Sequence, residues 1–404
     1  MKKQQLYLKF YLFLFLSIWI AGCSSSSDPT PTPQGNKYLV SSTLITNLTK
    51  TQIITNANVF FGSDPTLNLF IQAVVKSDLK VYKVIYKTKN ADNTDIQASG
   101  LLVIPSTTEA MPLISYQHGT QTDETFAPSY FNLKSTDTQG VSLISSNNFI
   151  ISCPDYIGYG VSKNLEHPYQ HRESLAQSSL DMTRASIEFL KQEKTSWNNK
   201  LMLTGYSEGG FATMALMKKI EQQFPTEFSL TATTCGAGGY NLSAFVKTIL
   251  NETTQGVSEY NNYYAWVLRT YNKIYGLNRQ MNVYLKEPYA TSLQNNGINA
   301  SLPGSFNLLV TDSFKKGIND GTDTPFINAI KDNDTFDWKP SSPLQLYHGS
   351  ADKLIFYSNS ESTYNAMIAR GATNVELKKI EGKDHIGSIQ DYLLGTFTFF
   401  SSKR

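Results

Sequence analysis

Residues 205–210 read Gly-Tyr-Ser-Glu-Gly-Gly, and the segments on either side of them indicate the fold. Residues 201–206 form a short apolar run typical of a buried strand, and residues 211–222 have the composition of a helix. A serine flanked by glycines between a strand and a helix is the pattern of a nucleophile elbow, a tight turn that exposes the serine hydroxyl at a helix N-terminus. A glycine-rich turn without chemistry is the alternative, which the flanking strand and helix disfavour. The stretch therefore predicts Ser207 as a nucleophile.

The alternation of strand and helix continues along most of the chain. Short apolar runs occur at residues 113–116, 149–153, 201–206, 230–234, 344–347 and 375–380. Helical stretches such as residues 174–191 lie between them, which indicates an α/β fold with a mainly parallel sheet covered by helices on both faces. Two β-rich runs, residues 79–87 and 96–104, are joined by turn-forming Asn and Asp and predict an N-terminal antiparallel hairpin.

A long interruption separates the last two predicted strands from the others. From Tyr240 to Pro340 the strand pattern stops, and about a hundred residues rich in Tyr, Asn and Thr intervene. A structureless loop of that length is uncommon in a compact domain. We therefore predict a helical cap at residues 241–340, inserted into a core made of residues 37–240 and 341–404. Within the first core segment, residues 37–78 stay unassigned, although residues 51–61 have the composition of a helix.

A serine hydroxyl is a poor nucleophile without a base, and histidine commonly supplies that base. Of the five histidines, His385 follows the last predicted strand and precedes the last helix, where this arrangement places its base. Asp352 follows the preceding strand and is predicted to orient His385. Asp384 is the rival acid, but a residue adjacent to the histidine is poorly placed to reach the far ring nitrogen. A structural or pocket-lining role is expected for the other four histidines, His118, His167, His171 and His348.

The tetrahedral intermediate of acyl transfer carries an oxyanion, which needs N–H donors already in place. One predicted donor is the backbone amide of Glu208, directly after the nucleophile. The other lies in residues 117–120, Gln-His-Gly-Thr, at the end of the first parallel strand. We assign it to the Thr120 amide in preference to that of Gly119.

The composition excludes several other classes of function. The 35 basic and 33 acidic residues nearly balance and show no basic surface pattern, so nucleic acid is not expected as a partner. His and Cys are scattered without ligand spacing, so no metal and no cofactor are expected. Cys153 and Cys235 lie in separate predicted strands and are expected to be free thiols. Asp155, in the Pro-Asp-x-x-Gly-x-Gly segment after a strand, is expected to be structural rather than catalytic.

The N-terminus has the features of an export signal. Lys2, Lys3 and Lys9 supply positive charge, and residues 10–20 form an apolar run too short to span a bilayer. Residues 20–23, Ile-Ala-Gly-Cys, resemble the bacterial lipobox, in which the cysteine receives a diacylglycerol.

We therefore expect a lipoprotein signal peptide at residues 1–22, lipidation of Cys23 and a flexible Ser/Thr/Pro-rich tether at residues 23–36. An ordinary signal peptide with an incidental cysteine is the alternative. The expected location is the bacterial cell envelope, attached to a membrane through the lipid anchor, and Ser24 favours the outer membrane.

With the elbow, Asp352 after a strand and the late His385 in this order, the chain resembles the α/β-hydrolase superfamily, and most closely its secretory lipase family. The resemblance covers roughly residues 101–400, including Gly-Ala-Gly-Gly at residues 236–239 and the insertion before residue 340. It implies that carboxylic esters are hydrolysed through an acyl-enzyme, with a cap that shapes the acyl-binding tunnel. Two departures concern the substrate: Glu208 stands where the fungal lipases usually carry glycine, and the cap is rich in Tyr and Asn.

The expected substrate is a small-molecule ester or an ester-decorated polymer, with short acyl groups or polysaccharide esters preferred. Two other functions stay open at this point. One is a peptidase of the prolyl-oligopeptidase type, although the segment before Leu79 is too short for the propeller such enzymes usually carry. The other is a non-catalytic binding lipoprotein with the same fold, against which the complete set of Ser207, Asp352 and His385 argues.

Overall fold

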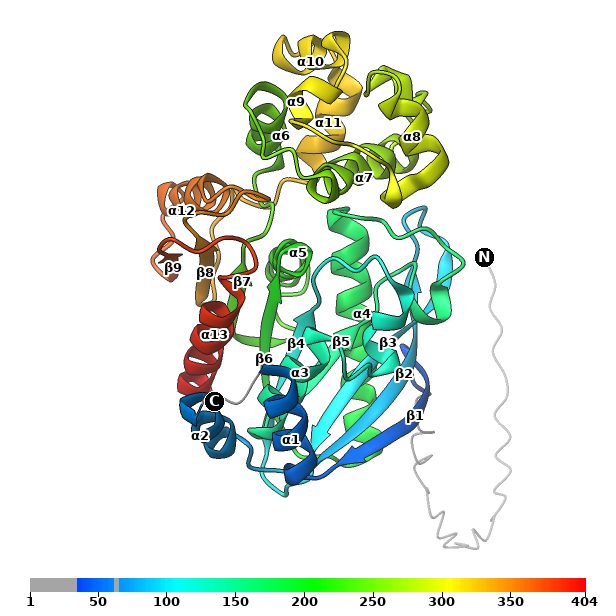
Figure 1. Cartoon of the computed structure of the whole chain (residues 1–404). Coiled ribbons are helices and arrows are strands. Elements are labelled where there is room, and N and C mark those ends of the chain that lie inside the picture. Colours follow the sequence, from blue (N-terminus) through cyan, green and yellow to red (C-terminus); the bar gives the residue numbers. More distant parts are fainter. Residues whose placement is uncertain (1–34, 62–64) are drawn as a thin grey trace, which may run out of the picture. The chain divides into compact units, whose positions relative to one another are not determined.

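The computed structural model describes residues 35–61 and 65–404 (Figure 1). The predicted signal peptide, Cys23 and residues 23–34 of the predicted tether lie outside the described residues. In the two described ranges, no helix combines the length and the apolar character needed to cross a membrane.

Nine strands form one mixed sheet in the order β1-β2-β3-β5-β4-β6-β7-β8-β9. The β1/β2, β2/β3 and β3/β5 pairs are antiparallel, and the remaining pairs are parallel. The expected mainly parallel sheet and the expected hairpin, which is β2 and β3, are therefore confirmed. The strands are β1 (Leu39–Leu48), β2 (Leu79–Lys89), β3 (Asp95–Pro105), β4 (Met111–Gln117), β5 (Ile150–Pro154), β6 (Trp197–Tyr206), β7 (Ser229–Gly236), β8 (Leu344–Gly349) and β9 (Val375–Ile380).

Helices cover both faces of the sheet, and the alternation of side chains along each strand decides which residue packs where. On one face, α4 (Arg172–Gln192), α5 (Glu208–Gln223) and α12 (Ser358–Ala369) contribute to a cluster that includes Leu201 and Leu203. On the other face, Met202 belongs to the cluster formed with α1 (Lys50–Phe61), α2 (Pro65–Val74), α3 (Thr136–Ser146) and α13 (Ile389–Lys403). The side chains of the continuous apolar run in β6 thus pack into two hydrophobic clusters, one on each face of the sheet.

The edge strand β1 lies in the segment that the sequence left unassigned. Only its first and last residues, Leu39 and Leu48, are buried, so it lacks the alternating pattern by which a strand is identified. Glu188 on α4 holds the start of β1, because its carboxylate accepts the backbone N–H groups of Lys37, Tyr38 and Leu39 at 2.9, 2.9 and 2.7 Å.

The insertion between β7 and β8 forms a helical cap above one end of the sheet (Figure 1). Its helices pack around an apolar cluster that also includes Leu175, Phe211 and Ile355 of the core. They are α6 (Leu242–Asn251), α7 (Ser258–Ile274), α8 (Tyr289–Asn296), α9 (Phe306–Leu309), α10 (Asp312–Asn319) and α11 (Thr324–Asp332). This arrangement matches the inserted helical cap expected for the fold.

The two ends of the cap meet at a narrow neck. The Thr335 N–H donates to the Tyr240 carbonyl oxygen at 2.9 Å, and the Ser243 N–H donates to the Asp334 carboxylate at 3.0 Å. The Asn359 side chain on α12 fixes this neck to the core, since its Oδ1 atom accepts the N–H of Tyr240 at 2.8 Å. The cap therefore enters and leaves the core at one place.

Cys153 on β5 and Cys235 on β7 are both buried and free, as expected. Strands β4 and β6 lie between the two strands that carry them. Burial raises the pKa of both thiols, which keeps them protonated.

Asp155 is fully buried just after β5 and holds neighbouring segments together. One carboxylate oxygen accepts the Ser99 hydroxyl at 2.5 Å, and the other accepts the Ser129 N–H at 2.7 Å. These contacts link β3, β5 and the 3₁₀ turn η2 (Pro128–Tyr130). They fit the structural role expected for this residue.

We expect Asp155→Ala to lower the free energy of unfolding by about 2–4 kcal/mol, because it leaves two buried donors without an acceptor. Asp123→Ala is the control. Asp123 is exposed and accepts the Thr125 N–H at 2.8 Å as the cap of a short 3₁₀ helix, so its loss is expected to cost about 1 kcal/mol or less. Urea unfolding followed by circular dichroism measures both, and equal losses for the two variants would contradict the structural role of Asp155.

Candidate active site

Ser207 lies at the turn from β6 to α5, with φ 58° and ψ −121°. Residues other than glycine rarely adopt this positive φ. The Ser207 N–H donates to the Gly236 carbonyl oxygen at 2.8 Å, which helps to hold the turn. Glycine is required on the far side of the turn, because a Cβ atom on Gly209 would lie 2.0 Å from the Gln117 carbonyl oxygen. The strained turn expected from residues 205–210 is present.

The structure brings together the three residues predicted as a triad. His385 Nε2 lies 2.9 Å from the Ser207 hydroxyl oxygen, and His385 Nδ1 lies 2.6 Å from Asp352 Oδ2. Asp352 follows β8, and His385 follows β9, so neighbouring parallel strands deliver the two residues to the same end of the sheet as the elbow. All three residues therefore form one continuous chain of polar contacts.

The rival acid, Asp384, takes a different role. Its carboxylate accepts the N–H of Gly387 at 2.7 Å, within its own turn, and it is exposed. It has no hydrogen bond to the ring of His385 in the described part of the chain.

Asp352 is buried, yet its carboxylate is well provided with donors. Oδ1 accepts the N–H groups of Leu354 and Ile355 at 2.9 and 3.0 Å. Burial alone would raise the pKa of Asp352, but hydrogen bonds from His348 and His385 outweigh it and hold the pKa well below its ordinary value. The carboxylate is therefore charged at any pH near neutrality and attracts a positive charge on the neighbouring imidazole.

His348 is a site residue whose contact with Asp352 the sequence analysis missed. Its Nε2 atom lies 2.7 Å from the Ile355 carbonyl oxygen and 3.2 Å from Asp352 Oδ2. A carbonyl oxygen only accepts hydrogen bonds, so Nε2 carries the proton and points it between these two oxygens. His348 lies four residues before Asp352, across the turn that ends β8, and this spacing would have indicated the contact between them.

The other histidines lie near the site without joining the triad. His118 Nδ1 is 2.7 Å from the Gly119 carbonyl oxygen. His167 Nε2 is 2.6 Å from Glu208 Oε1, and both side chains are buried. Burial lowers the pKa of His171 to about 4, so this ring is neutral near pH 7. Each therefore has the structural surroundings expected for it.

The two predicted oxyanion donors lie on segments that touch. Glu208 begins α5, so its N–H precedes the first helical hydrogen bond, and Ser207 makes no side-chain cap to it. The backbone N–H of Thr120 has no hydrogen-bond acceptor within residues 35–61 and 65–404. The Gln117 carbonyl oxygen at the end of β4 packs closely against Gly209, so the loop that carries Thr120 lies against the elbow.

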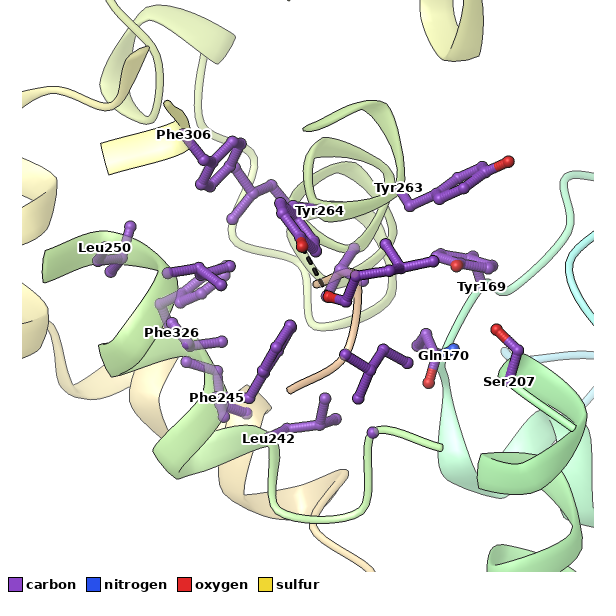
Figure 2. Close-up of a pocket in the computed structure, with 18 of the residues that line it drawn as sticks. Tyr169, Gln170, Ser207, Leu242, Phe245, Leu250, Tyr263, Tyr264, Phe306 and Phe326 are labelled. Carbon is purple, nitrogen blue, oxygen red and sulfur yellow. Dashed lines mark hydrogen bonds between the residues drawn. The ribbon is translucent and has the colours of Figure 1, made fainter. Parts of the chain in front are cut away.

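A narrow cavity runs from Ser207 into the cap (Figure 2). The cavity has a volume of about 60 Å³. Its walls come mainly from apolar side chains of α6 and α7, with Phe306, Phe326 and Ile355 among the others. Such a cavity accepts an aliphatic chain and disfavours charged groups.

Solved structures with the same fold include hydrolases and esterases. A Legionella pneumophila protein assigned as a hydrolase is 24% identical, with a TM-score of 0.80, and the match covers 91% of this chain and 98% of that one. The rice cell wall degrading esterase LipA from Xanthomonas oryzae is 21% identical, with a TM-score of 0.76 and coverage of 92% and 100%. Candida antarctica lipase A is 16% identical, with a TM-score of 0.60 and coverage of 89% and 82%. No curated protein matches the chain in sequence.

The sequence profile of the secretory lipase family matches residues 132–391. These residues include the elbow, the cap, and Asp352 and His385, which contact each other. This match spans well over half of the chain. The chain belongs to the secretory lipase family and is a carboxylic ester hydrolase.

Proposed function

We propose that Ser207, His385 and Asp352 are the catalytic triad of this ester hydrolase. The observation that carries the proposal is the unbroken series of contacts from the Ser207 hydroxyl through His385 to the buried Asp352 carboxylate, at 2.9 and 2.6 Å. The serine hydroxyl at the start of this series faces a cavity able to hold part of a substrate.

In the first half of the reaction, His385 Nε2 takes the hydroxyl proton while the Ser207 oxygen attacks the ester carbonyl carbon. The resulting imidazolium is stabilised by the charged Asp352. The carbonyl oxygen becomes an oxyanion, and the backbone N–H groups of Thr120 and Glu208 donate hydrogen bonds to it. When the tetrahedral intermediate collapses, the bond to the alcohol oxygen breaks and His385 returns the proton to the departing alcohol.

In the second half, a water molecule takes the place of the alcohol. His385 accepts a proton from this water, whose oxygen attacks the carbonyl carbon of the acyl-enzyme. Collapse of the second intermediate releases the carboxylic acid and returns the proton to Ser207. The net change is one ester and one water converted to one alcohol and one acid.

The cavity supports binding of the acyl part of the ester. The departing alcohol oxygen must lie within reach of His385, which gives it a proton, yet the cavity is lined by Ser207 and not by His385. The group that enters the cavity is therefore the acyl chain. The apolar walls of the cavity extend to Leu250 and Phe314 in the cap. This extent supports a longer aliphatic chain than the short acyl groups expected from the composition of the cap.

The alcohol part of the ester leaves on the side of His385, where the cavity sets no limit on its size. The proposed substrates therefore include both small-molecule esters and esters carried on a polymer. One protein of the same fold, the LipA esterase of Xanthomonas oryzae, is described as degrading rice cell walls, which supports keeping polymer-linked esters in this range.

We expect a fluorophosphonate probe to label the purified protein and to leave Ser207→Ala unlabelled, because the probe reacts with the activated serine oxygen.

Asp352→Asn is expected to lower kcat on an ester by about 10³–10⁴-fold, since the imidazole loses its charged partner. Asp384→Asn is the matched control and is expected to stay within about twofold of the parent. Labelling that survives in Ser207→Ala, or an equal loss in both aspartate variants, would refute the triad.

We expect Val246→Trp to shift the preferred acyl chain to a shorter length, because Val246 lines the cavity and the indole would fill it. With about 0.8 kcal/mol for each methylene excluded, kcat/KM for an octanoate ester should fall about tenfold or more relative to a butyrate ester. Leu308→Trp is the control, since Leu308 lies on α9 of the cap but is 65% exposed. A series of methyl esters of rising chain length measures the shift, and an unchanged optimum in Val246→Trp would rule out acyl binding in this cavity.

We also propose that the protein is a lipoprotein of the bacterial cell envelope. The support is the charged and apolar leader before Cys23, followed by residues 24–33, which are rich in Ser, Thr and Pro. A diacylglycerol on Cys23 would hold the enzyme at a membrane surface, and Ser24 supports the outer membrane. The tether would give the hydrolase room to reach esters near that surface.

If Cys23 carries the anchor, cells that express the full chain should incorporate labelled palmitate into it, and Cys23→Ala should abolish both the labelling and the sedimentation of activity with membranes. The variant keeps the export signal, so its activity is expected in the soluble envelope fraction. Cys153→Ala is the control, because the Cys153 side chain is buried in the core and is expected to leave palmitate labelling unchanged. Labelling that persists without Cys23 would contradict the anchor.

A further inference from the structure

Gln170 is the one amide side chain among the described residues that line the cavity. It is 5% exposed and lines the cavity together with Ser207. Gln170 follows Tyr169, whose hydroxyl lies 3.1 Å from that of Thr120, and in the view of Figure 2 the Gln170 amide lies toward the Ser207 end of the cavity. An acyl chain that starts at Ser207 would therefore pass this amide near its carbonyl end.

The amide of Gln170 has an oxygen without a partner. Its Oε1 atom is buried and accepts no hydrogen bond, whereas the tyrosine hydroxyls of the wall all have partners. The Tyr264 hydroxyl donates to the Leu354 carbonyl oxygen at 2.7 Å, and the Tyr169 hydroxyl lies 3.1 Å from that of Thr120. The remaining wall hydroxyl, that of Tyr263, donates to Glu259. A buried polar atom without a partner destabilises the free protein, so a ligand that pairs with it binds more tightly.

The backbone at this position is also unfavourable for glutamine. Gln170 has φ 55°, in the left-handed region that glycine and asparagine tolerate better. It is held there by the Tyr271 hydroxyl on α7, which donates to its carbonyl oxygen at 2.9 Å. A residue kept in a strained conformation with an unpaired buried amide is typical of a ligand-binding position, because neither feature stabilises the free protein.

The chemistry of the site indicates which group would pair with Gln170. An ionised group on the acyl chain would lose its hydration in an apolar cavity, which strongly disfavours its entry. A hydroxyl group loses far less on entry, and it donates to the free Oε1 atom. The position of the amide toward the Ser207 end of the cavity points to a hydroxyl on one of the first carbons after the carbonyl.

We infer that Gln170 is a specificity-determining residue that binds a hydroxyl group near the carbonyl end of the acyl chain, so that the preferred substrates are esters of hydroxy acids with an aliphatic tail. This inference rests on the proposed function, because it assumes that Ser207 attacks the carbonyl and that the acyl chain occupies the cavity. The tail then fills the apolar part of the cavity beyond the amide.

Three methyl esters of equal chain length test the inference on the purified enzyme: octanoate, 3-hydroxyoctanoate and 8-hydroxyoctanoate. Titration of the released acid gives kcat/KM for each. The 3-hydroxy ester is expected to exceed the 8-hydroxy ester by about tenfold or more, because the two differ only in whether the hydroxyl meets Gln170 or the apolar end of the cavity. The 3-hydroxy ester is also expected to exceed plain octanoate.

Gln170→Met provides the matched variant, with a side chain of similar length and no amide. It is expected to lower kcat/KM for the 3-hydroxy ester about tenfold and to raise it for octanoate, reversing the preference. Gln170→Asn controls for the backbone, because asparagine tolerates the left-handed conformation at least as well but carries its amide one carbon shorter. It should keep the thermal stability of the parent and lose most of the preference.

A parent enzyme that hydrolyses octanoate as well as 3-hydroxyoctanoate, or a Gln170→Met variant that keeps the parent's ratio, would overturn the role of Gln170 while leaving the triad intact. If no ester is hydrolysed and the fluorophosphonate probe does not label Ser207, the proposed function fails and the inference fails with it. The two failures are therefore distinguishable by the probe.

Discussion

The contact between the end of β4 and the first turn of α5 sets the geometry on which the site depends. A Cβ atom at Gly209 would lie 2.0 Å from the Gln117 carbonyl oxygen, and one at Gly205 would lie 2.3 Å from the carbonyl oxygen of Gly209. The backbones can approach this closely only without side chains. This approach forces Ser207 into its positive φ and brings the loop of Thr120 beside the amide of Glu208. The positions of Ser207 and of the Thr120 and Glu208 amides thus follow from one packing constraint.

The second requirement is a buried negative charge that the protein can tolerate. Moving a carboxylate out of water costs several kcal/mol, and Asp352 offsets this cost with two backbone N–H donors and two imidazole rings. His348 belongs to this group, since its proton points between Asp352 and the Ile355 carbonyl oxygen. Asp352 is therefore held in place from both sides, by His348 and by His385.

The sequence predicted the elements whose burial follows a simple pattern. The apolar runs of β4, β5 and β6 are buried on both faces, and the sequence around Ser207, Asp352 and His385 indicated strand ends. The fold and the meeting of these three residues at one end of the sheet could therefore be predicted together. Strand β1 was not found because most of its side chains are exposed on an edge. The fold of the cap was expected only as helical, since packing between its helices decides their ends.

Gln170 was not found from the sequence at all, for a different reason. Its burial, its left-handed backbone and its unpaired oxygen arise from contacts with the cap, above all the hydroxyl of Tyr271, which lies about a hundred residues further along the chain. The amino-acid composition around Gln170 does not indicate such a contact. His348 shows the intermediate case, in which the spacing from Asp352 was visible but its meaning depended on the turn after β8.

The neck of the cap has a consequence for how this family can diversify. Tyr240 and Thr335 are hydrogen-bonded neighbours, so the chain leaves the sheet and returns to it at nearly the same point. Insertions whose ends meet in this way can be lengthened, shortened or exchanged with little strain on the domain that carries them. Evolution can therefore exchange the walls of the cavity as a module while Ser207, Asp352 and His385 stay fixed in the turns that follow β6, β8 and β9.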